Sequence, residues 1–170
     1  AAAEANQRIK LNPGATLQRR IFRDGFVPNS GEFDVEAAGR TWRGQRAEHL
    51  GTGRVRVYYA PVGAWDDVRV AERGAGGGVP GGDLLAAELL REGERRQLIE
   101  LNPNAALQRR ILADGFVPSS AEFRTAEGGG GIGVAQRAEH LASGAVRVYH
   151  APVADAGRVG CVVGVERADS

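Results

Sequence analysis

Hydrophobic positions follow a helical spacing in two stretches of the chain, Leu11–Gly25 and Leu101–Gly115. Asn12 and Asn102 are residues that favour a helix start, because an Asn side chain accepts hydrogen bonds from the free N–H groups there. The glycine that ends each stretch can adopt the left-handed conformation that follows a last helical turn. We therefore expect a helix of about 11 residues in each stretch.

The period of the pattern changes to two after the first helix. Phe33 and Val35 alternate with acidic residues, and a long strand is expected over Arg40–Leu50, followed by a hairpin and a strand that ends at Pro61. A last strand is expected over Val68–Arg73, and over 162–167 near the end of the chain. The pattern predicts an α+β fold, in which a helix precedes an antiparallel meander of three or four strands.

Two blocks of sequence occur twice. Leu11–Phe33 returns as Leu101–Phe123 with 17 of 23 positions identical, and Gln45–Val62 returns as Gln136–Val153 with 14 of 18 identical. We interpret this as tandem duplication of one small unit, with the copies related by a pseudo-twofold axis or joined as beads. The glycine-rich stretch 126–133 has no counterpart in the first copy, so we expect the first hairpin of the second copy to be missing.

The repeat predicts the domain boundaries. We expect a first unit over 1–73, a glycine-rich linker over 74–82, and a second unit over 83–170 that begins with its own helix. Each unit is near the lower size limit for an independent core, which suggests that the copies pack together or belong to an assembly.

Composition and charge exclude several classes of protein. The 170 residues are 42% hydrophobic and 25% charged, which is ordinary for a folded soluble chain, and no apolar run is long enough to span a membrane. A net charge of +1 gives no basic excess for nucleic acid. The single Cys161 excludes an internal disulfide and a zinc site of several thiolates.

Motifs for cofactors and catalysis are weak. The segments GGGVPG (76–81) and GGGGIG (128–133) fit a nucleotide-binding pattern, but glycine tracts satisfy almost any such pattern and the strands here are antiparallel. His49 and His140 have no second histidine at metal-ligand spacing, so we interpret each as a half-buried residue bonded to a neighbour. We predict no catalytic residue, no metal and no cofactor.

The hairpin at Gly51–Gly53 fixes a register if its loop has three residues. Leu50 would then face Arg54, which places Glu48 opposite Arg56 and Arg46 opposite Tyr58. This register predicts one strand face with an ion pair next to a cation–π pair.

Polar identity between the copies has two explanations, a shared polar network or a shared binding surface. The identical pairs include Arg19 with Arg109, Arg20 with Arg110, Gln45 with Gln136 and Glu48 with Glu139. Arginine and tyrosine on one strand face would suit sugars, acidic groups or phosphate. The predicted ligand-binding residues are Arg46, Arg56, Tyr58, Arg137, Arg147 and Tyr149.

The leading functional hypothesis is a non-catalytic tandem binding module for a polysaccharide or another repeating cell-wall or cell-surface polymer, with two sites per chain. A structural or assembly subunit with protein contacts, including a homo-oligomer, is the first alternative. A small enzyme with its site between the copies is the second. The start AAAEANQ without Met suits a processed chain or a piece of a longer one. We expect a secreted or cell-surface location, and a cytoplasmic one stays open.

Overall fold

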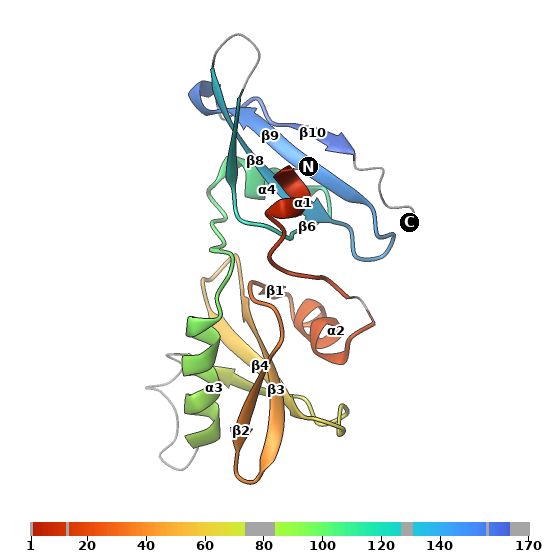
Figure 1. Cartoon of the computed structure of the whole chain (residues 1–170), viewed down its shortest axis with the longest axis vertical. Helices are drawn as coiled ribbons and strands as arrows, with labels where there is room; N and C mark the ends of the chain where they lie inside the picture. The colour runs from red at the N-terminus through yellow and green to blue at the C-terminus, as the bar shows by residue number, and fades with distance from the viewer. Residues whose placement is uncertain (1, 13, 74–83, 127–130, 156, 164–170) are drawn as a thin grey trace. The chain divides into compact units, whose positions relative to one another are not determined.

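The computed structural model describes residues 2–12, 14–73, 84–126, 131–155 and 157–163. They form helices and two antiparallel sheets, so the expected α+β class is confirmed (Figure 1). The chain divides into two compact units, Asn12–Leu98 and a second unit made of Ala1–Leu11 together with Ile99–Ser170. We call them the central unit and the split unit.

These units do not follow the expected ranges 1–73 and 83–170. The helix that precedes the second repeat, α3 (Leu84–Arg95), packs against the strands of the first repeat through Ala86 and Leu89. The first residues of the chain pack with the second repeat instead. The predicted linker 74–82 lies outside the described residues.

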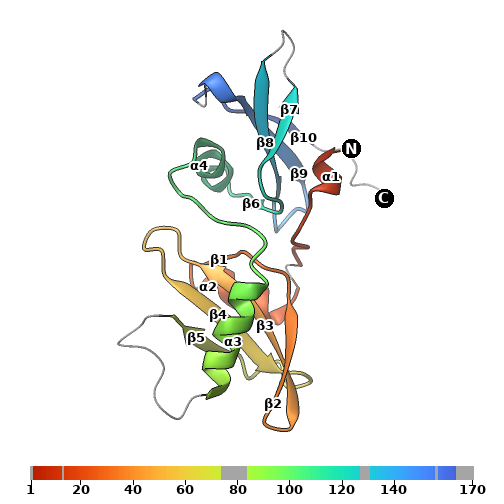
Figure 2. The ribbon, with the colours of Figure 1, turned by 60° about the vertical axis from the view of Figure 1, so that its left-hand side comes forward.

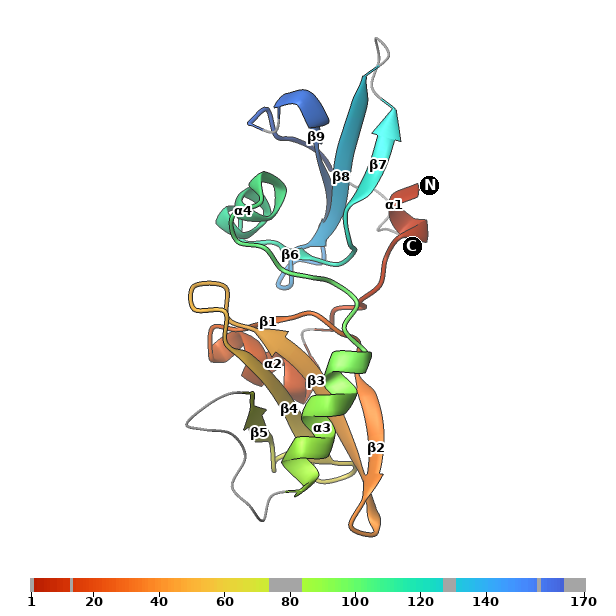
Figure 3. The ribbon, with the colours of Figure 1, turned by 90° about the vertical axis from the view of Figure 1, so that its left-hand side faces the viewer.

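The central unit runs from a helix through five strands to a second helix. Its further elements are α2 (Thr16–Arg23), β1 (Val27–Pro28), β2 (Phe33–Ala37), β3 (Arg40–Glu48), β4 (Val55–Pro61) and β5 (Arg69–Glu72). β4 lies between β3 and β5, while β1 and β2 both pair with the other edge of β3. α2 packs on one face of this sheet and α3 on the other (Figures 2 and 3).

The described elements of the split unit come in the same order, an α-helix and then five strands, without a second α-helix after them. They are α4 (Ala106–Ala113), β6 (Val117–Pro118), β7 (Phe123–Ala126), β8 (Ile132–Glu139), β9 (Val146–Pro152), a short 3-10 helix (Val153–Asp155) and β10 (Gly160–Val163). β7 pairs with β8, so the prediction that this hairpin is missing was wrong. α4 packs on one face of the sheet, and the single-turn helix α1 (Ala2–Ala5) contacts β8.

The helix ends were easier to predict than the helix starts. α2 begins at Thr16, later than expected, because Asn12 uses its side-chain oxygen to accept the N–H of residue 14 at 3.1 Å and so closes a turn before the helix. The expected end is confirmed. Gly25 has φ 85°, and the N–H of Phe26 donates to the carbonyl of Ile21 at 3.0 Å, which is the Schellman pattern.

The hairpin between β3 and β4 closes one residue earlier than predicted. The N–H of His49 donates to the carbonyl of Arg54 at 2.8 Å, so the loop is the four residues Leu50–Gly53. Gly53 still supplies the left-handed residue, with φ 74°. A four-residue loop and a three-residue loop both use that glycine, which is why the sequence could not distinguish them.

The shift by one residue moves neighbours to opposite faces of the sheet. Arg46 pairs with Val57 rather than Tyr58, and Tyr58 pairs with Gln45. Arg56 lies opposite Ala47, so the predicted cross-strand pairs of Arg56 with Glu48 and of Tyr58 with Arg46 do not form.

Candidate functional site

Tyr58 lies in the interior of the central unit, with a relative exposure of 0%. Its hydroxyl donates to the Oδ2 atom of Asp24 at 2.9 Å and accepts a hydrogen bond from Arg56 at 2.8 Å. Arg56 also donates to the same Asp24 oxygen at 3.2 Å and to Glu72 at 3.1 Å. Arg20 donates to that Asp24 oxygen at 3.1 Å. The network joins the end of α2 to strands β4 and β5.

Tyr149 is placed in the same way in the split unit, again with 0% exposure. Its hydroxyl donates to Asp114 at 2.8 Å and accepts from Arg147 at 2.8 Å. Arg147 and Arg110 reach the same carboxylate at 3.1 Å and 3.0 Å. Both units therefore tie the helix end to the sheet with one tyrosine, one aspartate and two arginines.

The pKa values reflect these contacts. Burial would raise the pKa of Asp24, but hydrogen bonds from Tyr58 and Arg20 and the charges of Arg20 and Arg56 outweigh it and hold the pKa below its ordinary value. The hydrogen bond from Tyr149 is the main cause of the lowered pKa of Asp114. Burial raises the pKa of each tyrosine to about 12. Carboxylates held ionised in this way are poor proton donors at neutral pH.

Arg46 and Arg137 lie on the other face of their sheets. Arg46 is 2% exposed and binds Glu94 on α3 at 3.1 Å, with Glu48 at 3.6 Å. Arg137 is 5% exposed and lies 3.1 Å from Glu139. Within each unit, the predicted ligand-binding residues are therefore divided between the two faces of the sheet. Their assignment to ligand binding stays an untested prediction, while the structure gives each of them partners within its unit.

The remaining polar identities also have structural partners. Gln45 and Gln136 donate to the backbone carbonyls of Ser30 and Ser120, each at 2.8 Å. Arg19 donates to the carbonyl of residue 14 and Arg109 to that of residue 104, each at 2.5 Å. These polar residues thus make equivalent contacts inside the two units.

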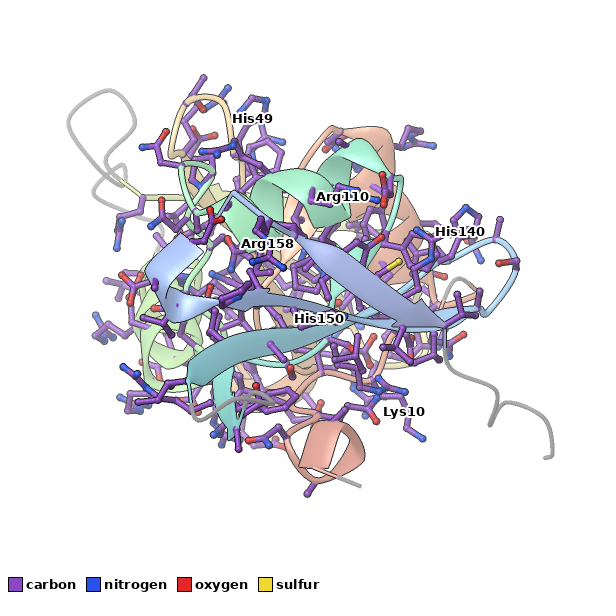
Figure 4. The ribbon with its side chains drawn as sticks, turned by 90° about the horizontal axis from the view of Figure 1, so that it is seen from above. Lys10, His49, Arg110, His140, His150 and Arg158 are labelled. Atoms are coloured by element: carbon purple, nitrogen blue, oxygen red, sulfur yellow. The ribbon has the colours of Figure 1, made fainter. Side chains whose placement is uncertain are left out.

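The two histidines of the repeat lie at hairpin loops (Figure 4). The Nδ1 atom of His49 accepts the N–H of Thr52 at 3.2 Å, and His140 accepts that of Ser143 at 3.1 Å. Both rings are half-buried, as we expected. Among the described residues, no group of three or more His, Cys, Asp or Glu side chains could hold a metal ion.

Each unit has a shallow pocket beside the start of its helix. The pocket of the central unit has a volume of ≈ 290 Å³, and that of the split unit ≈ 550 Å³. Both are lined by the equivalent residues Asn12 and Asn102, Ala15 and Ala105, and Glu32 and Glu122. These pockets were not predicted, because they combine a helix start with a loop that follows β1 or β6.

Trp65 and Arg43 line the pocket of the central unit only. The Arg43 guanidinium lies 5.5 Å from the centre of the Trp65 ring, and Asp34 holds it at 2.8 Å and 3.3 Å. Glu32 lies 3.9 Å from Arg43. Trp65 is half-buried, so part of its ring stays accessible. The sequence contained one signal for this pocket, because Trp65 is an aromatic residue in a turn and the segment after Pro152 has none at the matching place.

A scan against protein-family models, a search of curated proteins and a search of solved structures each found no match for this chain. No helix among the described residues is long and apolar enough to cross a membrane.

Proposed function

We propose that the protein is a non-catalytic binding module for a hydrated polymer such as a polysaccharide, and that the ligand occupies the pocket beside Trp65. The observation that carries this proposal is the set of side chains in that pocket. It combines one indole ring with a carboxylate, an amide and a hydroxyl, supplied by Glu32, Asn12 and Thr16. Such a ligand would place the protein outside the cell or on its surface.

The chemistry of this pocket suits a sugar ring. An indole offers a flat apolar surface for the C–H face of a sugar, and the polar groups around it can bind the hydroxyls. Arg43 covers part of the Trp65 ring and is itself held by Asp34, so the ring is positioned before a ligand arrives. A positioned ring loses little freedom on binding, which favours affinity.

We propose one such site per chain rather than two. The pocket of the split unit has Glu122 at the position of Glu32, but its lining holds no aromatic residue and two carboxylates, Glu100 and Glu122. Without a stacking plane, that pocket lacks the main apolar contact for a sugar.

A glycan array on the isolated chain, followed by calorimetry with the best ligand, tests this proposal. Glu32→Gln should weaken binding, whereas Glu122→Gln is the matched control at the same place in the split unit and should leave affinity unchanged. Trp65→Ala should abolish binding. The absence of any glycan bound at millimolar concentration, or an equal effect of the two glutamate variants, would refute it.

We also infer that the central and split units are copies of one module. The sequence identities support this, and so does the strand register, since Gln45 pairs with Tyr58 as Gln136 pairs with Tyr149. The copies would have kept the internal network and diverged in their pockets.

The alternative function, a structural or assembly subunit, is favoured by a different observation. One face of the split unit's sheet exposes apolar side chains, among them Val162 at 58%. Size-exclusion chromatography with light scattering tests whether copies of the chain associate through it; a monomer at all concentrations would count against a homo-oligomer.

A further inference from the structure

The two sheets are covered differently on one face. In the central unit, α3 covers the face that carries Phe33, Val57 and Tyr59, and Leu89 of α3 is 0% exposed there. The approach is close, because a Cβ on Gly93 would lie 2.8 Å from a methyl group of Val57. Residues of α3 thus form part of the hydrophobic core on this face.

The equivalent face of the split unit is the open face, which we define by the residues Phe123, Thr125, Val148, His150 and Val162. Cross-strand pairing places these side chains together, because Val148 pairs with Val162 as Val57 pairs with Ala71. Ala71 is 4% exposed, whereas Val162 is 58% exposed. Phe123, Val148 and His150 are half-buried, whereas their counterparts Phe33, Val57 and Tyr59 are buried. Figure 4 shows His150 against this sheet.

The start of the chain fills only part of the place that α3 takes in the central unit. The N–H of Leu98 donates to the carbonyl of Asn29 at 3.0 Å, and the N–H of Arg8 donates to the carbonyl of Ser119 at 2.9 Å. Arg8 therefore lies against the split unit as Leu98 lies against the central unit, and Gln7 forms a bridge with Ser120.

The first pair of similar blocks, Leu11–Phe33 and Leu101–Phe123, is separated by 90 residues. At this offset, α1 corresponds to the last turn of α3, residues 92–95. The two earlier turns of α3 contain Leu85, Ala86, Leu89 and Leu90, which pack on the sheet of the central unit. Nothing in the described part of the split unit corresponds to those turns.

We propose that the open face is a docking site for an amphipathic α-helix of a partner protein, with leucines and a small residue spaced as on α3. The covered face of the central unit is the observation that selects a helix as the occupant, because the same strands carry related side chains in both units. A helix buries such a face with its stripe of i, i+3 and i+4 residues. This inference does not depend on saccharide binding, since no residue of the open face lines the pocket beside Trp65.

A synthetic helix with the sequence of Leu84–Arg95 provides the test. A covalent bridge between positions 87 and 91 holds the peptide helical, and its last turn can replace α1, a single turn that has little stability of its own. Nuclear magnetic resonance titration of the full chain should show saturable shifts at Val148, His150 and Val162. A peptide with Leu89→Asp should not bind.

Two neighbouring valines provide matched variants of the chain. Val162 and Val163 are each 58% exposed, but they pair with Val148 and Arg147 and so point to opposite faces of the sheet. Val162→Glu should weaken peptide binding at least tenfold, while Val163→Glu should change it less than twofold. Because both side chains are exposed, both variants should fold.

Three results would overturn the proposal: no peptide binding, equal effects of the two valine variants, or shifts that map to another surface. If the peptide fails to bind and Val162→Glu abolishes a concentration-dependent dimer seen by light scattering, the occupant is a second copy of this chain.

Discussion

Replacing Tyr58 or Tyr149 by Phe removes one hydroxyl from the interior of each unit and leaves the ring in place. The hydroxyl of Tyr58 makes two hydrogen bonds to charged groups, at 2.8 Å and 2.9 Å. Hydrogen bonds to charged groups stabilise a protein by about 1.5–3 kcal/mol. Asp24 and Arg56 keep other partners in the variant, so we expect Tyr58→Phe to lower the free energy of unfolding by about 1.5–2 kcal/mol.

Tyr149→Phe should cost at least as much, because the arginine in that network has fewer partners. Arg56 contacts Glu72 on β5, but the residue opposite Arg147 on β10 is Val163. In the variant, the hydrogen bond to Asp114 at 3.1 Å is the one that Arg147 keeps with a side chain in the described part of the chain, besides its contact with the ring of Phe116. We expect a loss of about 2–3 kcal/mol, the upper part of the range for hydrogen bonds to charged groups.

Urea unfolding with two probes distinguishes the units. Both tryptophans, Trp42 and Trp65, belong to the central unit, so tryptophan fluorescence follows that unit while circular dichroism follows both. Tyr58→Phe should move the fluorescence midpoint without changing the urea slope. Tyr149→Phe should move a circular dichroism transition.

Alkaline titration gives an independent readout of the same hydroxyls. The pKa of Tyr58 and of Tyr149 is raised to about 12 in the folded chain, against an ordinary 10.0. A raised pKa stabilises the fold fully below pH 10, and this stability is lost as pH rises towards 12. Each Phe variant should remove one late component from the tyrosinate absorbance. A change in unfolding free energy below about 0.5 kcal/mol in both variants would refute a structural role for the hydroxyls.

Three further predictions concern the charges and the α3 interface. The pKa values of Asp24 and Asp114 are lowered in the folded chain, so their stabilising effect is present above the ordinary pKa of 3.8 and is lost as pH falls through the folded pKa. The urea midpoint should therefore drop below about pH 4. In Asp24→Asn the midpoint should depend less on pH. Gly93→Ala should destabilise the central unit by roughly 1–2 kcal/mol, although Ala favours a helix, because its Cβ would meet the stiff side chain of Val57 at 2.8 Å; an increase in stability by urea unfolding would contradict this. Leu89→Ala should cost about 2–5 kcal/mol in the fluorescence transition, and a smaller loss would mean that α3 is loosely packed.

Local patterns in the sequence were sufficient for the α+β class and for the helix ends, because periodicity and Gly25 act over a few residues. The register was missed by one residue because Gly53 suits two loop lengths. The partners of the shared polar residues could not be predicted from the sequence for another reason. Arg46 binds Glu94, which is 48 residues away, and only tertiary packing brings them together.

The pocket and the open face were missed for related reasons. Trp65 gave a visible signal, but its neighbours Asn12 and Arg43 come from separate elements. The open face follows from the way α3 packs backwards onto the preceding repeat, which the order of elements along the chain did not indicate.

The divided composition of the split unit also affects the order in which the parts of the chain can fold. Ile9 is 0% exposed in the finished fold, yet its backbone partner Ser119 leaves the ribosome long after it. The whole of Asn12–Leu98 can fold during that interval, since domains generally form as units while synthesis continues. Ile9 and its neighbours thus reach their final place only after Ser119 has been made, although the unit that directly follows them in the chain can already be folded by then.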